Sequence, residues 1–346
     1  FTYNAALMTA DGQLNDPATL TGPVRLDSSG QLQCTACHDP HNDQYGKFLV
    51  KNNSASALCV TCHNRTYWTA SVHKTSTATW NSTAPDPWPN TTETTVAANA
   101  CENCHSPHTS GRKPRLHTQA NEENVCFVCH NANVATQNIQ TEFNKASKHP
   151  IASTSWVHDP NEDPIDPTTR HVQCVDCHNP HAAKSLAATA PNATGAQAGV
   201  KGINQAGAEV NPVAFEYELC YRCHADSTAA PAPQITRQVT QKNKRLAFDP
   251  ANASYHPVAA VGQYAAIPGL INPWVATSRM YCTDCHNNDT GPGAGGTGPK
   301  GPHGSTYSPL LERRYDFTDN VAEAAALYAL CYKCHDRTNL MAAGGF

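Results

Sequence analysis

Apolar positions in this 346-residue chain occur in short runs that polar and small residues interrupt. None of these runs reaches the roughly 18 apolar residues that a membrane-spanning helix requires. The nearest candidate, Val321 to Leu330, is shorter and contains Glu323. The pattern predicts a loop-rich chain with short helices and little sheet, and no membrane span.

Four short runs are helix-like, and each leads directly into a Cys-x-x-Cys pair. They read SASAL, NEENV, AFEYEL and AALYAL. Ser54 and Asn121 suit N-cap positions, and Glu122 and Glu123 suit a first helical turn. Four other Cys-x-x-Cys pairs follow segments that read as extended or turn-like. We therefore expect helices at every second pair along the chain.

Composition leaves the source of the core unexplained. Hydrophobic residues make up 39% of the chain, and mean hydropathy is −0.52. Such a chain would struggle to offset its ordering entropy by apolar burial, yet with 15% charged residues and a net charge of −4 it does not resemble a disordered chain. Lys and Arg number only 24 and do not cluster, which disfavours nucleic-acid binding.

Cysteine and histidine carry the chemistry. The chain has 16 Cys and 18 His, and every Cys belongs to a Cys-x-x-Cys-His motif. This motif is typical of covalent c-type haem attachment. Two thiols one helical turn apart can form thioethers to one edge of a porphyrin, and the next residue can then bind iron from one face. The eight motifs are Cys34-Cys37-His38, Cys59-Cys62-His63, Cys101-Cys104-His105, Cys126-Cys129-His130, Cys174-Cys177-His178, Cys220-Cys223-His224, Cys282-Cys285-His286 and Cys331-Cys334-His335.

Zinc knuckles and disulfides are the alternative interpretations of so many cysteines. Neither requires a His directly after every pair, so the sequence favours eight covalently attached c-type haems. Each haem then serves about 43 residues (346/8), and stacked haems form the core. Two propionates per haem bring the net charge to about −20. Haem c is attached outside the cytoplasm, and the chain begins at Phe1 rather than Met, so we expect an exported, processed protein.

The motifs form an internal repeat of haem pairs. From each odd-numbered motif to the next, the first cysteines are 25, 25, 46 and 49 residues apart. The sequence thus predicts one octahaem unit, residues 1–346, built from four tandem two-haem modules. The modules cover approximately residues 30–80, 95–150, 168–260 and 278–346.

Ten further histidines could supply the second axial ligand of each iron, and bis-histidine coordination is the expected default. Three odd motifs continue as Cys-x-x-Cys-His-x-Pro-His. The last of these histidines cannot pass around its own porphyrin, so it should bind a neighbouring haem. A second class of histidines follows the even motifs. The predicted distal ligands are His41, His108, His181 and His303 in the first class and His73, His149 and His256 in the second.

The eighth distal ligand is less directly indicated. His171, three residues before Cys174, is our first choice; His158 comes next and His117 last. Sulfur ligation could come only from Met8, Met280 or Met341.

The Cys-x-x-Cys-His-x-Pro-His motifs and the phrase RHVQCVDCHNPH resemble the doubled-CXXCH multihaem cytochromes. Within that group the chain is most similar to the extracellular cytochromes that polymerise into haem-chain filaments, often called cytochrome nanowires. The resemblance extends by motifs over residues 30–346. It implies a haem chain with alternating parallel and T-shaped stacking, and subunits that can lend a histidine to a haem in the next copy.

Three functions follow from these features. The first is extracellular electron transfer through a filament of identical copies, with redox proteins or extracellular acceptors as partners. The second is a periplasmic electron carrier with the same internal haem chain. The third is an octahaem redox enzyme, which needs one iron with an open site. Ten spare histidines for eight haems disfavour the enzyme, so no catalytic residue is predicted.

Overall fold

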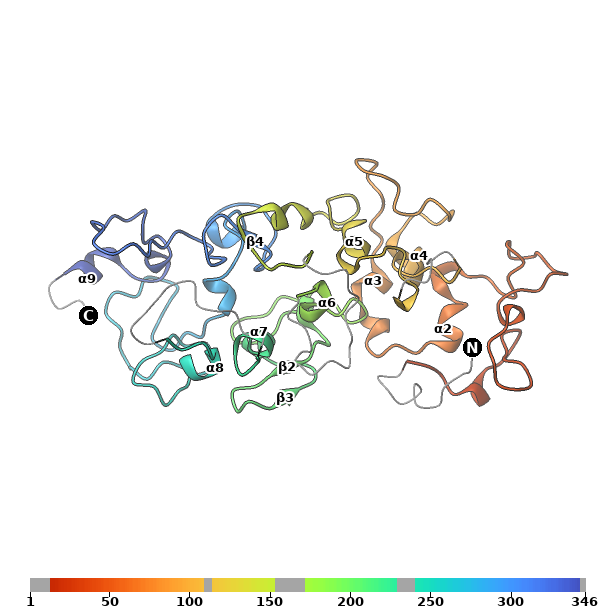
Figure 1. Ribbon diagram of the computed structural model, residues 1–346, viewed down its shortest axis with the longest axis horizontal. Coiled ribbons are helices and arrows are strands. Elements are labelled where there is room, and N and C mark those ends of the chain that lie inside the picture. The colour runs from red at the N-terminus through yellow and green to blue at the C-terminus, as the bar shows by residue number, and fades with distance from the viewer. Residues whose placement is uncertain (1–12, 109–113, 153–171, 229–239, 343–346) are drawn as a thin grey trace. The chain divides into compact units, whose positions relative to one another are not determined.

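The computed structural model describes residues 13–108, 114–152, 172–228 and 240–342. In these ranges most of the backbone forms loops and turns, and the helices and strands are short (Figure 1). The prediction of a loop-rich fold with short helices and little sheet is confirmed.

The α-helices are mostly a single turn long. The longest described one is α7, and it contains the sixth Cys-x-x-Cys-His motif. Within the described ranges the α-helices are α2 (Cys59–Cys62), α3 (Val72–Thr75), α4 (Val96–Asn99), α5 (Glu122–Phe127), α6 (Cys174–Cys177), α7 (Glu216–His224), α8 (Lys244–Ala247) and α9 (Arg337–Met341).

Short 3-10 helices are also frequent, and four of them lie at odd or terminal haem motifs. They are η1 (Pro17–Thr19), η2 (Cys34–Ala36), η3 (Ser54–Ser56), η4 (Trp68–Ala70), η5 (Ala100–Asn103), η6 (Pro114–Leu116), η7 (Gln140–Asn144), η8 (Gly195–Gln197), η9 (Cys282–Asp284), η10 (Pro292–Ala294) and η11 (Cys331–Lys333).

Sheet is limited to two antiparallel pairs of two-residue strands in the described chain. Strand β1 (Ser147–Lys148) pairs with β4 (Gly304–Ser305), so that Ser147 lies opposite Ser305 and Lys148 opposite Gly304. Strand β2 (Gly202–Ile203) pairs with β3 (Glu209–Val210). The β1–β4 pair joins segments more than 150 residues apart in sequence and holds two histidine-bearing loops together.

The helices before the even motifs follow the sequence prediction only in part. Asn121 is the N-cap of α5, and Glu122 and Glu123 occupy its first turn, as expected. Ser54 is not an N-cap: Asn53 precedes η3, and its side-chain oxygen accepts the Leu58 N–H at 3.0 Å. That prediction was wrong: Ser54 is the first residue of η3, and Asn53 holds the N-cap position without a side-chain capping bond.

The expected helix before the eighth motif is absent from the described structure. Residues 325–330 form turns, and a Leu327 N–H to Ala324 C=O bond of 2.9 Å closes one of them. Ala324 to Ala326 are exposed. A short helix needs a buried apolar face for stability, and these alanines supply none.

The chain forms two compact units. The first contains residues 1–129 and 179–185, and the second contains residues 130–178 and 186–346. Each unit therefore carries four pairs of haem-attaching cysteines. The division into four two-haem modules is a finer prediction, and it stays a prediction.

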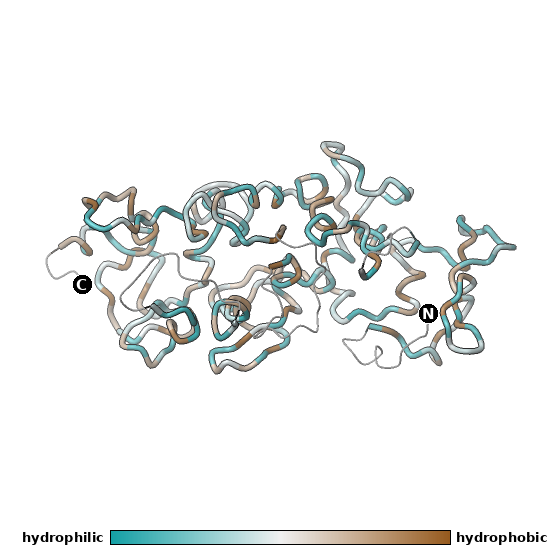
Figure 2. Tube along the Cα trace, viewed as in Figure 1, coloured by the Kyte–Doolittle hydropathy of each residue, from teal (hydrophilic) through white to brown (hydrophobic). Residues whose placement is uncertain are grey.

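Apolar side chains form only small clusters. In the second unit one cluster centres on Ile203, Tyr217, Tyr221 and Met280. Hydrophobic segments are short and scattered along the chain (Figure 2). The accessible surface is 19277 Å², against about 13,600 Å² for a compact protein of this mass. The polypeptide by itself thus buries little surface, in line with its low aliphatic content.

No helix in the described ranges is both long enough and apolar enough to cross a membrane.

Candidate haem-binding site

Six of the Cys-x-x-Cys-His motifs close with the same tight turn. In six motifs the His N–H donates to the carbonyl of the first Cys at 2.9–3.1 Å. This bond fixes the turn and brings the two thiols and the imidazole to one local site, as covalent haem attachment requires. The accepting carbonyls belong to Cys34, Cys59, Cys101, Cys174, Cys282 and Cys331.

Backbone carbonyls fix the tautomer of four motif histidines. Because a carbonyl only accepts hydrogen bonds, the Nδ1 atom facing it carries the proton. The Nε2 lone pair is then available to a metal, which is the usual arrangement for a histidine ligand. The pairs are His38 with Lys47 O (2.9 Å), His105 with Arg115 O (2.8 Å), His178 with Ala196 O (2.9 Å) and His286 with Pro309 O (2.9 Å).

Burial keeps three of these motif imidazoles neutral. Desolvation is the main cause that lowers the pKa of His105, His178 and His286 below the ordinary value of 6.5. Each is therefore uncharged at pH 7. A neutral imidazole is the form that binds iron.

Four motif histidines each face a second histidine at a similar distance. The ring planes meet at very different angles, from 6° to 67°, but the separations of the ring centroids vary little. The pairs are His38 with His108 (5.7 Å), His105 with His181 (6.4 Å), His178 with His303 (6.1 Å) and His224 with His149 (6.3 Å).

These separations fit a haem iron between the two rings. A metal–imidazole bond is about 2 Å long, so imidazoles on opposite faces of one iron have centroids roughly 6 Å apart. Rings in direct stacking contact would lie closer. Burial lowers the pKa of His181 and of His303 to about 3, so both partners are neutral. The residues present therefore fit the group, and a haem held there would supply a one-electron redox centre.

Aromatic side chains support two of the facing histidines. Trp68 lies edge-on to His181 with 6.1 Å between ring centroids, and Phe143 lies edge-on to His303 at 5.8 Å. Such contacts limit rotation of the imidazole. A ring with a fixed orientation needs little rearrangement when its iron changes oxidation state.

The remaining predicted ligands differ in their surroundings. His256 interacts electrostatically with the motif histidine His335, and its pKa is lowered by burial. His73 lies in α3, and its Nδ1 donates to the Pro180 carbonyl at 2.8 Å. The His41 side chain is 93% exposed, and its Nδ1 lies 3.6 Å from the Asp39 carboxylate. His171 and His158 lie outside the described residues.

His117 lies close to His105 but in a different relation from the facing pairs. The two residues form an antiparallel bridge, and their ring centroids are 5.4 Å apart. Bridge partners project to the same side of the backbone ladder, so His117 lies beside His105. Burial lowers the pKa of His117 to about 4.

The cysteines show how the attachment sites follow one another. Within each predicted module the second cysteines of the two motifs lie near each other. Between modules, the first cysteines of the second and third motifs, and of the sixth and seventh motifs, also lie near each other. The sites of each unit thus form a row in sequence order. The pairs inside modules are Cys37–Cys62, Cys104–Cys129, Cys177–Cys223 and Cys285–Cys334; those between modules are Cys59–Cys101 and Cys220–Cys282.

Sequence reasoning missed several buried carboxylates near these motifs. Glu216 in α7 accepts the Cys282 N–H at 2.6 Å and the Thr283 hydroxyl, and burial raises its pKa to about 7. Asp176 pairs with Arg222 at 3.3 Å. Acidic residues next to or inside a Cys-x-x-Cys pair were visible in the sequence, but their burial was not.

All sixteen cysteines are free of disulfides. Among the described residues, no three His, Cys, Asp or Glu side chains gather as a ligand set for a metal ion.

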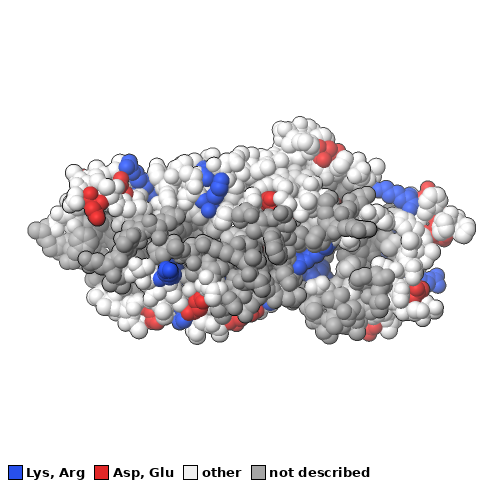
Figure 3. Space-filling model, in the orientation of Figure 1, with Lys and Arg blue, Asp and Glu red and all other residues white. Residues whose placement is uncertain are grey.

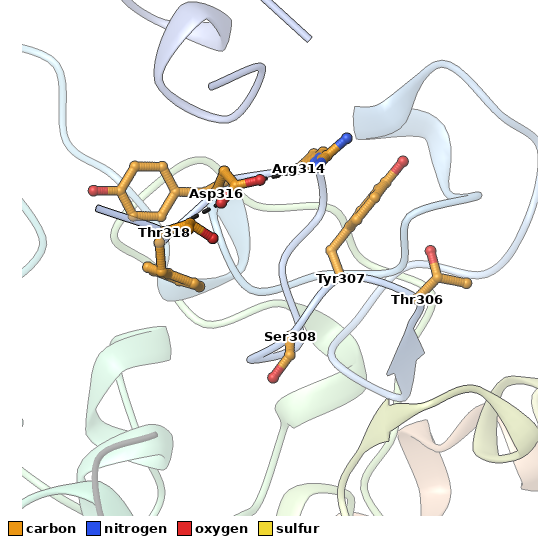
Figure 4. A pocket seen from close by; sticks show the side chains of 8 residues that line it. Thr306, Tyr307, Ser308, Arg314, Asp316 and Thr318 are labelled. Carbon is orange, nitrogen blue, oxygen red and sulfur yellow. Dashed lines mark hydrogen bonds and ion pairs between the residues drawn. The ribbon is translucent and has the colours of Figure 1, made fainter. Parts of the chain in front are cut away.

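No predicted ligand lines the surface pocket drawn in Figure 4. It has a volume of about 390 Å³, and its lining includes Thr306, Tyr307 and Thr318 (Figure 4). Arg314 and Asp316 form an ion pair of 2.9 Å along its wall. On the face shown in Figure 3, charged side chains stand singly or in small groups among uncharged ones.

Two protein families match parts of the chain. Residues 28–66 and 274–340 match the doubled CXXCH motif family. Residues 93–257 match the family described as outer membrane cytochrome MtrC/MtrF-like, domains II/IV. None of the curated proteins and none of the solved structures matched.

These matches agree with the Cys-x-x-Cys-His turns and the facing histidines. The protein is a multihaem c-type cytochrome. Its haem is covalently bound, as the sequence predicted.

Proposed function

We propose that this protein is an octahaem, bis-histidine cytochrome that carries electrons outside the cell, and that copies of it polymerise into a conducting filament. The similarity to outer membrane cytochrome domains supports an exported, cell-surface protein. The eight Cys-x-x-Cys-His motifs support eight haems.

The observation that carries the proposal is the set of four facing histidine pairs, 5.7–6.4 Å between ring centroids. Two neutral imidazoles on one iron leave no position for a substrate. They also favour lower reduction potentials than a Met/His pair gives. Such irons accept and release electrons without binding a reactant, so the function is transfer and not catalysis.

The row of attachment sites supports long-range transfer within each unit. Neighbouring cysteine pairs lie near each other within each unit, which places consecutive haem attachment sites side by side. Electrons can then pass from haem to haem. The partners are other copies of the chain, a redox protein that donates electrons, and an extracellular acceptor.

The proposal is tested on the haem-loaded protein. The mass should correspond to eight haems per chain, and the oxidised spectrum should be low-spin and unchanged by nitrite or cyanide. A chain with fewer haems, or a wild-type filament with a high-spin haem that binds these ligands, would contradict it. A protein that meets the spectral criteria but forms no polymer under any condition would be an electron carrier instead.

A further inference from the structure

A serine and a histidine in the first unit dock on a Pro-His segment. The Ser71 hydroxyl donates to the Pro180 carbonyl at 3.1 Å, and His73 Nδ1 donates to the same oxygen at 2.8 Å. Between them the Val72 N–H donates to the Ala183 carbonyl at 2.8 Å. The sequence Ser-x-His thus binds along the backbone around Pro180-His181.

The second unit contains a related arrangement with the same histidine contact, although there the Ser147 hydroxyl accepts the Leu310 N–H at 2.7 Å. His149 Nδ1 donates to the Pro302 carbonyl at 2.9 Å. The two residues before it, Ser147 and Lys148, form β1 and pair with β4 directly after His303. A Ser-x-His sequence again lies along a Pro-His segment. The contact is therefore a repeated joint, which we call the Ser-x-His joint.

The joint links the histidines of two neighbouring haem sites. In the second unit it ties together His149, which faces His224, and His303, which faces His178. Those two recipients belong to the fifth and sixth motifs. One histidine comes from the preceding module and the other from the following module. The hydrogen bond at Pro302 couples the positions of the two.

The Pro-His histidines all follow one rule of direction. His108 faces His38, His181 faces His105 and His303 faces His178. In each pair the Pro-His histidine follows the odd-numbered motif that comes next along the chain. The fourth such histidine, His41, has no ring opposite it in the described structure.

Two other places lack their partner in the described structure. The seventh motif has no histidine facing it, and the third Ser-x-His sequence has no Pro-His segment docked on it. Among the described residues no histidine ring faces His286, although its Nδ1 is fixed by Pro309 O. Ser254-Tyr255-His256 is a Ser-x-His sequence, and Ser254 is exposed where Ser71 is fully buried. No Pro-His segment lies on it in the part of the chain that the structure describes.

We infer that Ser254-Tyr255-His256 is a docking surface for Asp39-Pro40-His41 of a second copy of this chain. The contact repeats the Ser-x-His joint: His256 donates to the Pro40 carbonyl of the second copy, and the second copy's His41 lies opposite His286. In the three observed pairs the facing histidine comes later in the chain than the motif histidine. His41 precedes His286, so a pair within one chain would break this order. A head-to-tail contact between copies preserves it. This inference rests on the proposed function and names its subunit contact.

Two variants of the haem-loaded protein isolate the two halves of this contact. His41→Ala removes the lent imidazole. Tyr255→Pro removes the N–H that corresponds to the donor of Val72, and Tyr255→Ala is its matched control because it keeps that N–H. We expect His41→Ala and Tyr255→Pro to associate at least about tenfold more weakly than wild type, and Tyr255→Ala to associate normally.

Mixing the two defective variants gives the sharpest result. Each has one intact half, so the mixture should form dimers and stop there, while each alone stays monomeric by light scattering. His41→Ala alone should also show one high-spin haem in eight. In the mixture, a dimer has one His286 site that receives a histidine and one that does not, so only the second site should stay high-spin. Polymers of His41→Ala with a fully low-spin spectrum would overturn the inference, as would a monomeric wild type with eight low-spin haems.

Failure of the inference is distinguishable from failure of the proposed function. A wild type with eight low-spin haems and a contact elsewhere contradicts only the docking surface. A wild-type polymer with fewer than eight haems contradicts the function itself.

Discussion

The imidazoles of His178 and His303 face each other with 6.1 Å between their ring centroids, although His178 belongs to the fifth haem motif and His303 follows the seventh. Burial holds both rings neutral. A haem between these two histidines would link two stretches of chain that share little apolar contact. The haems can thus take the structural role that aliphatic side chains have in most cores.

Removal of a facing histidine should open one iron. We expect His303→Gly to convert one of eight haems from low-spin to high-spin, because His178 would keep only its own side of the iron. Added imidazole should restore the low-spin signal. Electron paramagnetic resonance of the oxidised protein measures both effects.

His117→Ala is the matched control, since His117 lies beside His105 and not opposite it. Its spectrum should stay fully low-spin. A high-spin haem in this variant would make His117 a ligand and contradict the assignment of His181 to the same site.

Exchange of a ligand type should change one reduction potential. His181→Met places a thioether opposite His105, and Met/His ligation raises the potential of a c-type haem. We expect one haem to titrate at a more positive potential while the other seven stay unchanged. Spectroelectrochemical titration tests this, and an unchanged curve would remove His181 from the coordination sphere.

Glu216 should make stability depend on pH. Burial raises its pKa from the ordinary 4.5 to about 7, so the folded protein binds this proton more tightly than the unfolded chain. The contribution is fully present below about pH 4.5 and is lost as the pH rises through about 7. The loss amounts to at most roughly 3 kcal/mol.

Denaturant midpoints at pH 5 and pH 8 measure this dependence. Glu216→Gln should reduce the difference between the two midpoints, whereas Glu209→Gln, at an exposed position in β3, should not. An equal difference in wild type and Glu216→Gln would show that this carboxyl titrates normally.

Arg222 should be important for stability. Its guanidinium donates to the Asp176 carbonyl at 3.0 Å and pairs with the same residue's carboxylate at 3.3 Å, and both side chains are buried. Arg222→Leu removes the cation that pairs with this buried carboxylate and should cost about 3–5 kcal/mol of unfolding free energy. Chemical denaturation checks this value. Arg314, which is exposed and pairs with Asp316, offers a control: Arg314→Ala should cost less than about 1 kcal/mol.

The covalent part of the haem sites was predictable because it is local. Two cysteines and a histidine within five residues define each motif, and the same turn closes six of them. The loop-rich fold followed from the scarcity of long apolar runs. Helices were predicted less well: Asn121 caps α5, but Ser54 caps nothing, and the alanines before Cys331 form turns.

The pairing of histidines could not be read from the sequence. His108 and His181 were expected to bind neighbouring haems, but spacing does not say that each faces the preceding odd motif. Backbone carbonyls that fix the tautomer, such as Lys47 O, leave no residue-type signal at all. The repeated Ser-x-His sequence was a signal that could have located the joints with Pro180 and Pro302.

The most direct measurement is an electron-microscopy reconstruction of the haem-loaded protein. The account predicts eight haems in the order of their motifs, with iron between the rings of His38 and His108, His105 and His181, His178 and His303, and His224 and His149. Identical copies should continue the haem row along a filament. An iron in any of these four sites bound by a different distal residue, or haems out of sequence order, would contradict it.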